Sequence, residues 1–304
     1  MNGEFFSRHF SLEKVSEGIY AAIAKEGGGS VGNAGFIDLG DQTIVFDTFN
    51  TQQAAEELKS IATKITNRPV TFVINSHWHG DHIRGNQVFQ DSTIISSQLT
   101  YEKIKDLQPT RIRQQIDNIQ DLTNYIHSLK AQMRKTNDIK LAQKISFLSE
   151  VETSLPTLEL VLPKQTFKEE ITFHGTKRSA KLFTWGGGHS YCDAVLFIPN
   201  EKVIFMGDLL FVNSHPSFFE ESNPEQWIQI LKKVGSLDFQ KAVPGHGPIG
   251  TKKDLLEVSD YIAEMIQIAI TANLEEILIP FKYQNWTSPE IYQQNFQSLK
   301  ELYS

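Results

Sequence analysis

A short loop near residue 80 gathers side chains that bind metal ions. Within the six residues His77 to His82, the sequence His-Trp-His-Gly-Asp-His places three of the chain's nine histidines beside one aspartate. One residue separates His77 from His79, so in an extended segment their side chains point the same way. Imidazole nitrogens and carboxylate oxygens without thiolate suit zinc, iron or manganese. A cluster of this kind is typical of a metal or catalytic site.

The pattern His-x-His-x-Asp-His resembles the signature of the metallo-β-lactamase superfamily. That resemblance implies further ligands downstream, in the order His, Asp, His, each in a loop after a strand. They are present as His189 in Gly-Gly-Gly-His-Ser, Asp208 in Met-Gly-Asp and His246 in Pro-Gly-His-Gly. The resemblance covers about residues 18 to 250 and is specific for fold and metal, not for substrate. It implies an α/β fold, the four-layer αββα sandwich, with the metals at one edge between two sheets.

The family resemblance also implies a dinuclear centre. One metal would be bound by His77, His79 and His189, the other by Asp81, His82 and His246, and Asp208 would bridge the two. The ions would be two divalent metals, zinc by preference, with iron or manganese as alternatives. A shared hydroxide would attack a carbonyl carbon, and Asp81 or Asp208 would orient it and pass its proton to the leaving group.

A second carboxylate, Asp47, resembles a residue that supports the metal loop through hydrogen bonds. The alternative for Asp47 is a turn former at the end of a strand. Substrate contact is a hypothesis for four other side chains, and each also has an ordinary structural role as its alternative. They are Trp78, Arg84, Tyr191 and His215. Cys192 lies near His189, but the family has no thiolate ligand there, so we expect a small buried side chain.

The resemblance implies a hydrolase acting on a small ester, thioester, lactone or amide. A mononuclear iron dioxygenase that oxidises persulfides uses a subset of the same ligands and remains an alternative. A β-lactam-hydrolysing enzyme is a second alternative, although one large subclass has Cys where this chain has Asp208. Diiron flavoprotein relatives have Glu where this chain has His79. A non-catalytic binding protein on this fold would be expected to have lost a ligand, and none is missing.

The elements that must position these residues are visible as hydrophobic patterns. The apolar run 70–74 predicts a buried strand leading into the metal loop. Residues 36–47 and 196–208 share one pattern of strand, turn, strand and carboxylate, which predicts two hairpins. Apolar residues at helical spacing predict helices over 51–65, from Asn223-Pro224, from Thr251 to about 274 and from Ser288-Pro289. Further strands are predicted over 158–162, 171–173, 180–184 and 240–243.

Residues 98–152 interrupt the strand pattern. Ile112, Ile116 and Ile119 begin a series of apolar residues spaced three or four apart, which predicts an inserted helical hairpin between the halves of the fold. The insertion could be a solvated helical pair packed on the core, a cap over the site or a dimer face. A homodimer through this segment is therefore one expectation.

Composition bounds the remaining possibilities. The 304 residues allow one large domain or two small ones, and the absence of a long linker predicts one domain over 1–304. The net charge of −7 argues against a nucleic-acid partner and leaves a small-molecule substrate. The single cysteine excludes a disulfide within the chain. No apolar segment suits a signal peptide or a membrane span, so a cytoplasmic protein without a membrane partner is expected.

Overall fold

The computed structural model describes residues 5–271 and 276–303. The chain divides into two compact units, and each contains one sheet and its own helices. Unit 1 comprises Met1–Phe167 and Gly175–Lys177, and unit 2 comprises Lys168–His174 and Arg178–Ser304. This mixed architecture confirms the predicted α/β class. The expectation of one domain over 1–304 stays a prediction.

Unit 1 is built on a seven-stranded sheet whose strands follow one another in sequence order. Strands β1 to β4 are antiparallel, and β4 to β7 are parallel. The strands are β1 (Phe10–Ser16), β2 (Ile19–Ala24), β3 (Ala34–Asp38), β4 (Thr43–Phe46), β5 (Phe72–Ile74), β6 (Thr93–Ser97) and β7 (Gln165–Phe167). The β3–β4 hairpin matches the prediction. Because β4 and β5 are parallel and adjacent, their carboxyl ends bring Asp47 and the metal loop together.

Helix α1 (Gln52–Thr66) packs on this sheet. It begins at Thr51, whose side chain accepts a hydrogen bond from the Ala54 amide, and it ends at Asn67 in the left-handed conformation. Its apolar face includes Leu58 and Ile61, which join the core formed with the strands. Helix α1 thereby buries its apolar face against the sheet of unit 1.

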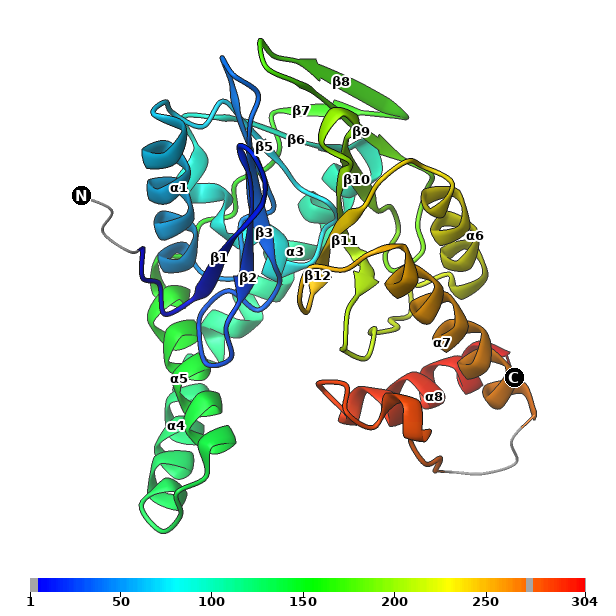
Figure 1. Ribbon diagram of the computed structural model, residues 1–304. Helices are drawn as coiled ribbons and strands as arrows, with labels where there is room; N and C mark the ends of the chain where they lie inside the picture. The colour runs from blue at the N-terminus through cyan, green and yellow to red at the C-terminus, as the bar shows by residue number, and fades with distance from the viewer. Residues whose placement is uncertain (1–4, 272–275, 304) are drawn as a thin grey trace. The chain divides into compact units, whose positions relative to one another are not determined.

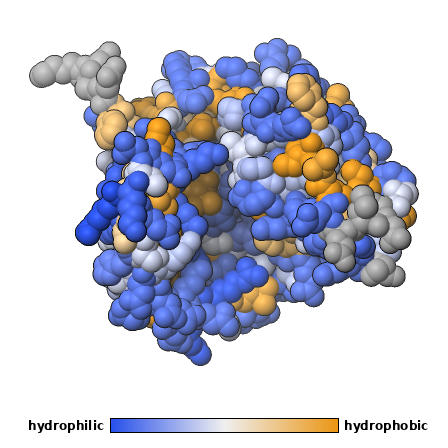
Figure 2. Space-filling view, turned by 90° about the horizontal axis from the view of Figure 1, so that it is seen from below, coloured by the Kyte–Doolittle hydropathy of each residue, from blue (hydrophilic) through white to orange (hydrophobic). Residues whose placement is uncertain are grey.

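The insertion consists of three helices rather than one hairpin. They are α3 (Gln98–Asp117), α4 (Ile119–Met133) and α5 (Ile139–Ser154). They connect β6 to β7, which are neighbours in the same sheet, so the insertion lies within unit 1 and not between two halves of the fold. In Figure 1, α4 and α5 extend as a pair away from the sheet of unit 1. Figure 2 views the molecule from below Figure 1, which is the side toward which α4 and α5 extend. The surface seen there is mainly hydrophilic, with scattered hydrophobic groups.

Unit 2 is built on a five-stranded sheet in the order β12-β11-β10-β9-β8. Its strands are β8 (Glu170–His174), β9 (Ser179–Thr184), β10 (Ala194–Ile198), β11 (Val203–Phe211) and β12 (Lys241–His246). Strands β8 to β11 are antiparallel, and β12 runs parallel to β11. The predicted hairpin 196–208 is formed by β10 and β11. Asp208 lies inside β11 and His246 ends β12, so neither follows its strand in a loop as expected.

Helices α6 (Pro224–Gly235), α7 (Lys252–Thr271) and α8 (Glu290–Tyr303) cover the core of unit 2. Asn223 begins α6 by accepting a hydrogen bond from the Gln226 amide, as its position before Pro224 predicts. A helix is predicted from Thr251 to about residue 274. Helix α7 matches it up to Thr271, and the last residues of the predicted range lie outside the described residues. Within the described residues, no helix is both long and apolar enough to cross a bilayer.

One predicted strand is wrong. Residues 158–162 form no strand, and the chain next pairs at β7, beginning at Gln165. Leu160 and Leu162 instead pack beside Trp78, Ile83 and Ile104. The alternating apolar side chains of this segment therefore pack against the metal loop and α3, and the segment joins no sheet.

Candidate metal centre

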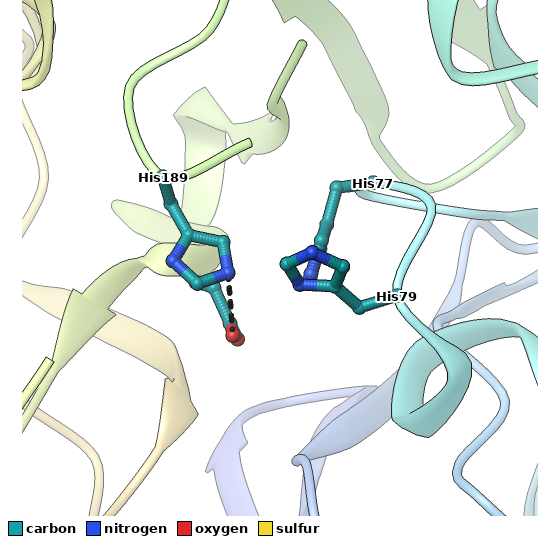
Figure 3. Close-up of side chains that lie close together, drawn as sticks. His77, His79 and His189 are labelled. Atoms are coloured by element: carbon teal, nitrogen blue, oxygen red, sulfur yellow. Dashed lines mark ion pairs between the residues drawn. The ribbon is translucent and has the colours of Figure 1, made fainter. Parts of the chain in front are cut away.

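The donors of unit 1 come from the loop that follows β5 and from the first turn of α2 (Gly80–Ile83). His77, His79 and His82 are buried, whereas the Asp81 side chain is 22% exposed. The ring of His77 lies 4.6 Å from that of His79 and 4.4 Å from that of His82, measured between centroids. Figure 3 shows His77 and His79 on this loop. The structure thus brings these three rings together as the motif predicts.

Asp47 is the hub that holds this loop. It is fully buried at the end of β4. Its Oδ1 accepts a hydrogen bond of 2.8 Å from the Ser76 amide, and its Oδ2 accepts one of 2.8 Å from the Ser76 hydroxyl. His82 Nδ1 lies 2.9 Å from the same Oδ2. The carboxylate therefore contacts both ends of the loop, which is the supporting role suggested by the family resemblance.

These hydrogen bonds fix the tautomers of two histidines. The Ser76 hydroxyl donates its only proton to Asp47, so at 2.9 Å it accepts a proton from His77 Nδ1. His82 Nδ1 likewise donates to the Asp47 carboxylate. Both imidazoles consequently carry their proton on Nδ1 and present the lone pair of Nε2, which is the form that binds a metal ion.

Asp47 occupies its position at a conformational cost. Its φ of 60° lies in the left-handed region, where a residue other than glycine is strained by on the order of 1 kcal/mol or more. Burial raises the pKa of its carboxyl group, and the His82 ring and the Ser76 donors oppose that shift. Strain and burial at one residue indicate that its contacts, rather than local preference, hold it in place.

Gly32 makes room for His82. A Cβ on Gly32 would lie 2.7 Å from Cε1 and 2.8 Å from Nε2 of the His82 ring. Contacts this short are not tolerated by real side chains, so any other residue would displace the ring or cover its donor nitrogen. The space beside His82 Nε2 is therefore preserved by glycine.

In unit 2, Asp208 lies between two histidines. Its Oδ2 is 3.2 Å from His189 Nε2 and 3.3 Å from His246 Nε2. The dashed line in Figure 3 marks the ion pair of His189. The Asp208 side chain is 5% exposed, and that of His246 is 22% exposed. One carboxylate oxygen thus contacts both imidazoles, an arrangement suited to a shared ligand.

The register of β11 and β12 creates this arrangement. Gly207 has a φ of 52° at an irregularity in the pairing, and it lies opposite Pro244. A Cβ on the neighbouring Gly245 would lie 1.9 Å from Asp208 Oδ1. The Asp208 carboxylate can occupy its site only because residue 245 has no side chain.

His189 is held by its surroundings in unit 2. Its Nδ1 lies 3.1 Å from the Ser217 carbonyl oxygen, which can only accept, so the proton is on Nδ1 and the lone pair is on Nε2. The ring also packs edge-on against Trp227 of α6. Asp193 Oδ2 accepts hydrogen bonds from the backbone amides of Gly188, His189 and Ser190 at 2.8–3.2 Å. The carboxylate of Asp193 therefore shapes the loop that carries His189.

The donor chemistry fits a divalent metal ion. The donors are imidazole nitrogens and carboxylate oxygens, the set that zinc, iron and manganese accept. His77, His82 and His189 each present Nε2 while Nδ1 is engaged. Among the described residues, some His and Asp side chains lie close enough together to hold a metal ion. All seven predicted ligands are among them: His77, His79, Asp81, His82, His189, Asp208 and His246.

The predicted substrate-contacting residues occupy different environments. Trp78 is 1% exposed and packs with Ile83 and Ile104, so its burial favours a packing role. His215 is 1% exposed among Tyr261, Trp286 and Tyr292, which also favours packing. Burial lowers the pKa of His215 to about 4, so this imidazole is neutral near pH 7.

Two other candidates are more accessible. Tyr191 is 38% exposed, and Arg84 lines a cavity in unit 1. Burial lowers the pKa of the Arg84 guanidinium, with Arg111 adding to this shift and Asp81 opposing it. Cys192 is buried, as expected, with Sγ 3.3 Å from the Thr184 hydroxyl. Substrate contact by any of these residues stays a prediction.

Sequence reasoning missed four residues that position the donors: Gly32, Ser76, Asp193 and Gly245. Ser76 directly precedes His77, and its hydroxyl was a local signal for a hydrogen bond to the loop. Asp193 follows the glycine-rich segment at His189, where buried backbone amides need an acceptor. The two glycines gave no local signal, because their role depends on the approach of distant side chains.

Comparison with known proteins gives consistent results. The family model described as "Metallo-beta-lactamase superfamily" matches residues 27–246. The chain is 24% identical over 253 residues to "Metallo-beta-lactamase type 2" of Bacteroides fragilis, covering 80% of this chain and 82% of that protein. It is 20% identical over 288 residues to "Beta-lactamase-like protein 2 homolog" of Caenorhabditis elegans, covering 93% and 78% respectively.

Solved structures show a related fold. A metallo-beta-lactamase from Pontibacter korlensis matches with a TM-score of 0.59 at 17% identity, covering 84% of this chain and 99% of that one. At this identity the match establishes the fold alone. The matched segment of the family model contains all seven candidate ligands, from His77 to His246.

Proposed function

The chain belongs to the metallo-beta-lactamase superfamily, and from that premise we propose that it is a hydrolase with a dinuclear metal centre. The donors of both units would form this one centre. One metal would be held by His77, His79 and His189, the other by Asp81, His82 and His246, with Asp208 shared between them. The observation that carries the proposal is the engaged Nδ1 of His77, His82 and His189, which leaves Nε2 as the donor of each ring.

A pair of divalent metals supplies a nucleophilic water near neutral pH and polarises a carbonyl oxygen. The chain's own residues supply orientation and proton transfer. Asp47 holds the His77 and His82 rings, and Asp193 shapes the loop of His189. We assign proton transfer to Asp81, because its side chain is 22% exposed and can reach solvent. Asp208, at 5% exposure, serves instead to hold and orient.

The proposed substrate class is a small ester, thioester, lactone or amide. These compounds share a carbonyl carbon that water attacks and a leaving group that needs a proton. Two relatives carry beta-lactamase in their names, and a β-lactam is a cyclic amide within this class. Zinc is the proposed metal because three-coordinate sets of His and carboxylate are typical of catalytic zinc sites.

The test combines metal analysis with a substrate panel. We expect close to two divalent metals per chain, mostly zinc, after loading and removal of excess metal. At least one ester, thioester, lactone or β-lactam should then be hydrolysed, and a chelator should abolish that hydrolysis until zinc is restored.

Two outcomes would overturn the proposal. One tightly held iron per chain, with oxygen uptake on glutathione persulfide, would identify a dioxygenase. Two metals without turnover of either kind of substrate would identify a binding protein on the same fold.

A further inference from the structure

A cavity with both polar and apolar lining lies within unit 1 against the metal loop. Its volume is about 630 Å³, and its lining comes from the metal loop and from all three helices of the insertion. Gly80 and Arg84 contribute from the loop side, Arg111 from α3, Tyr125 from α4 and Val151 from α5. Because Gly80 lies between His79 and Asp81, a molecule in this cavity would be next to two of the proposed metal ligands.

Arg84 reaches the cavity with unused hydrogen-bonding capacity. Its Nη1 donates to Asn50 Oδ1 at 3.2 Å and its Nη2 to Gln115 Oε1 at 2.7 Å, and both acceptors are neutral amides. Its Nε is buried and has no hydrogen-bond partner among the described residues. A Cβ on Gly80 would lie 2.7 Å from this Nε, so glycine there makes room for the guanidinium. A buried donor of a charged group that lacks a partner points to a ligand that supplies one.

Arg111 presents a second guanidinium to the same cavity. It lies over the Trp78 ring, with Cζ 4.2 Å from the ring centroid. Helix α3 is anchored there, because Gln108 Nε2 donates to the Trp78 carbonyl oxygen at 2.8 Å. Stacking on an aromatic face fixes the plane of a guanidinium and leaves its N–H edge available for an anion.

The charges around the cavity are unbalanced. Its lining contains two arginines and one carboxylate, Asp121. Across the described part of the chain, no carboxylate forms an ion pair with either Arg84 or Arg111, although the Asp81 carboxylate is near enough to oppose the lowering of the Arg84 pKa. This positive site stands out in a chain of net charge −7. The remaining lining includes Leu122 and Leu155, which offer an apolar wall. The combination suits an organic anion rather than an inorganic ion.

We propose that this cavity binds the oxyanion of an acidic substrate, with Arg84 and Arg111 holding the anionic group and the apolar wall contacting the organic body. The oxyanion can be a carboxylate or a phosphate monoester, because a guanidinium fork matches both. Binding of the anion does not depend on the proposed hydrolase activity. The inference rests on that proposed function only for the placement of the reacting carbonyl group, which would lie toward the metal loop. It assigns the helical insertion the role of selecting acidic substrates.

Binding is tested without turnover, by calorimetry on the metal-loaded protein. The probes are 4-phenylbutyrate, phenyl phosphate and the neutral 4-phenylbutanol. The test variant is Arg111→Gln. The matched control is Arg113→Gln, which removes the same charge from another exposed position of the same helix and does not line the cavity. Metal content is measured for each protein, so that coordination of the probe by metal is constant across the comparison.

We expect at least one acidic probe to bind at least about 10-fold more tightly than the alcohol. Arg111→Gln should weaken that binding by about 10- to 100-fold, as the loss of a charge-assisted hydrogen bond predicts. Arg113→Gln should stay within about twofold of the unmodified chain, and Arg111→Lys should restore part of the loss. Equal binding of acid and alcohol, or equal losses in the Arg111→Gln and Arg113→Gln proteins, would overturn the proposal.

Turnover separates this inference from the proposed function. For a hydrolysed pair of 4-nitrophenyl esters, the hemisuccinate and the butyrate, Arg111→Gln should lower the ratio of kcat/KM for acidic over neutral ester by about 10-fold or more. If neutral esters are hydrolysed and the ratio does not change, the cavity proposal alone fails. If acidic probes bind through Arg111 and no ester is hydrolysed, the hydrolase proposal alone fails.

Discussion

The donors of unit 1 and those of unit 2 are held in place by different means. In unit 1, four candidate ligands lie within six consecutive residues, and a single carboxylate, Asp47, fixes the loop through Ser76 and His82. In unit 2, the three candidate ligands come from three separate segments. Strand register and glycine contacts set Asp208 and His246, whereas His189 is held by a loop that Asp193 shapes.

Only part of a metal site is encoded in one short segment of sequence. The unit 1 loop carries its donors as a motif and needs one distant residue to orient them. The unit 2 donors are far apart in sequence: His189 lies in a loop, Asp208 lies inside β11 and His246 ends β12. Unit 1 should therefore be sensitive to loss of one hydrogen-bonding hub, and unit 2 to small changes in backbone approach.

The largest effect should come from removing Asp208, the carboxylate of unit 2 that we propose is shared between the metals. We expect Asp208→Ala to release at least one metal and to lower activity by more than about 100-fold, because losing a ligand costs more than losing its support. Cys192→Ala should keep both metals, since the thiol is a buried packing residue. Metal analysis and hydrolysis rates check both variants. Release of metal by Cys192→Ala but not by Asp208→Ala would refute the ligand assignment.

The next effect tests the role of backbone approach in unit 2. Gly245→Ala would place a Cβ 1.9 Å from Asp208 Oδ1, so the carboxylate must move. A displacement of about 1 Å can cost about 100-fold in rate, and we expect a loss of that order with weaker metal binding. Gly235→Ala is the matched control, because a Cβ there meets nothing within 4 Å. Equal activity of the two variants would show that Asp208 tolerates displacement.

The hub of unit 1 should be next in rank. Asp47→Asn keeps the left-handed backbone, which Asn tolerates, but weakens the acceptor for Ser76 and His82. We expect metal affinity to fall by about 10- to 100-fold, the usual cost of losing a residue that orients a ligand. Asp91→Asn removes an exposed carboxylate of unit 1 that pairs with Lys59, and it should leave metal affinity unchanged. Competition with a chromophoric chelator measures both, and matching affinities would contradict the hub.

The smallest effect concerns a histidine of unit 2 that is outside the donor set. Burial lowers the pKa of His215 to about 4 from its ordinary 6.5. The unfolded chain then binds more protons below pH 6.5, so stability is complete above that pH and falls as the pH drops toward 4. We expect His215 to account for about 1 kcal/mol of the loss between pH 7 and 5, allowing for solvent screening.

Denaturant unfolding at the two pH values measures this term, with and without His215→Gln. The variant should lose less stability on acidification than the unmodified chain. Equal losses would mean that His215 accepts a proton in the folded state as easily as in the unfolded state.

The sequence predicts the donors better than it predicts what positions them. The unit 1 motif is local, and the hairpin ending at Asp47 was recognisable from its strand pattern. Gly32 and His82 are far apart in sequence, so no pattern reveals that one must be small to accommodate the other. Asp193 was missed for a related reason, because its three amide donors become apparent only once the loop is folded.

The fold was predicted to a similar extent. Strands with strong turn signals, such as the β3–β4 hairpin, appear where expected. Residues 158–162 have the apolar alternation of a strand, but Leu160 and Leu162 pack beside Trp78 instead. The insertion was expected as one hairpin, yet the helix breaks at Asn118 into α3 and α4. Tertiary contact decided both cases, and a single sequence does not show which partner a hydrophobic face will find.

The proposed dinuclear centre requires that donors from both units bind one pair of metal ions. Anomalous diffraction at the zinc edge, from crystals of the zinc-loaded protein, locates these ions. We expect two peaks per chain about 3.5–4 Å apart, one beside His77 and His79, the other beside His82, with the Asp208 carboxylate between them. A single peak, or two peaks each contacted by the donors of one unit only, would contradict the proposed centre.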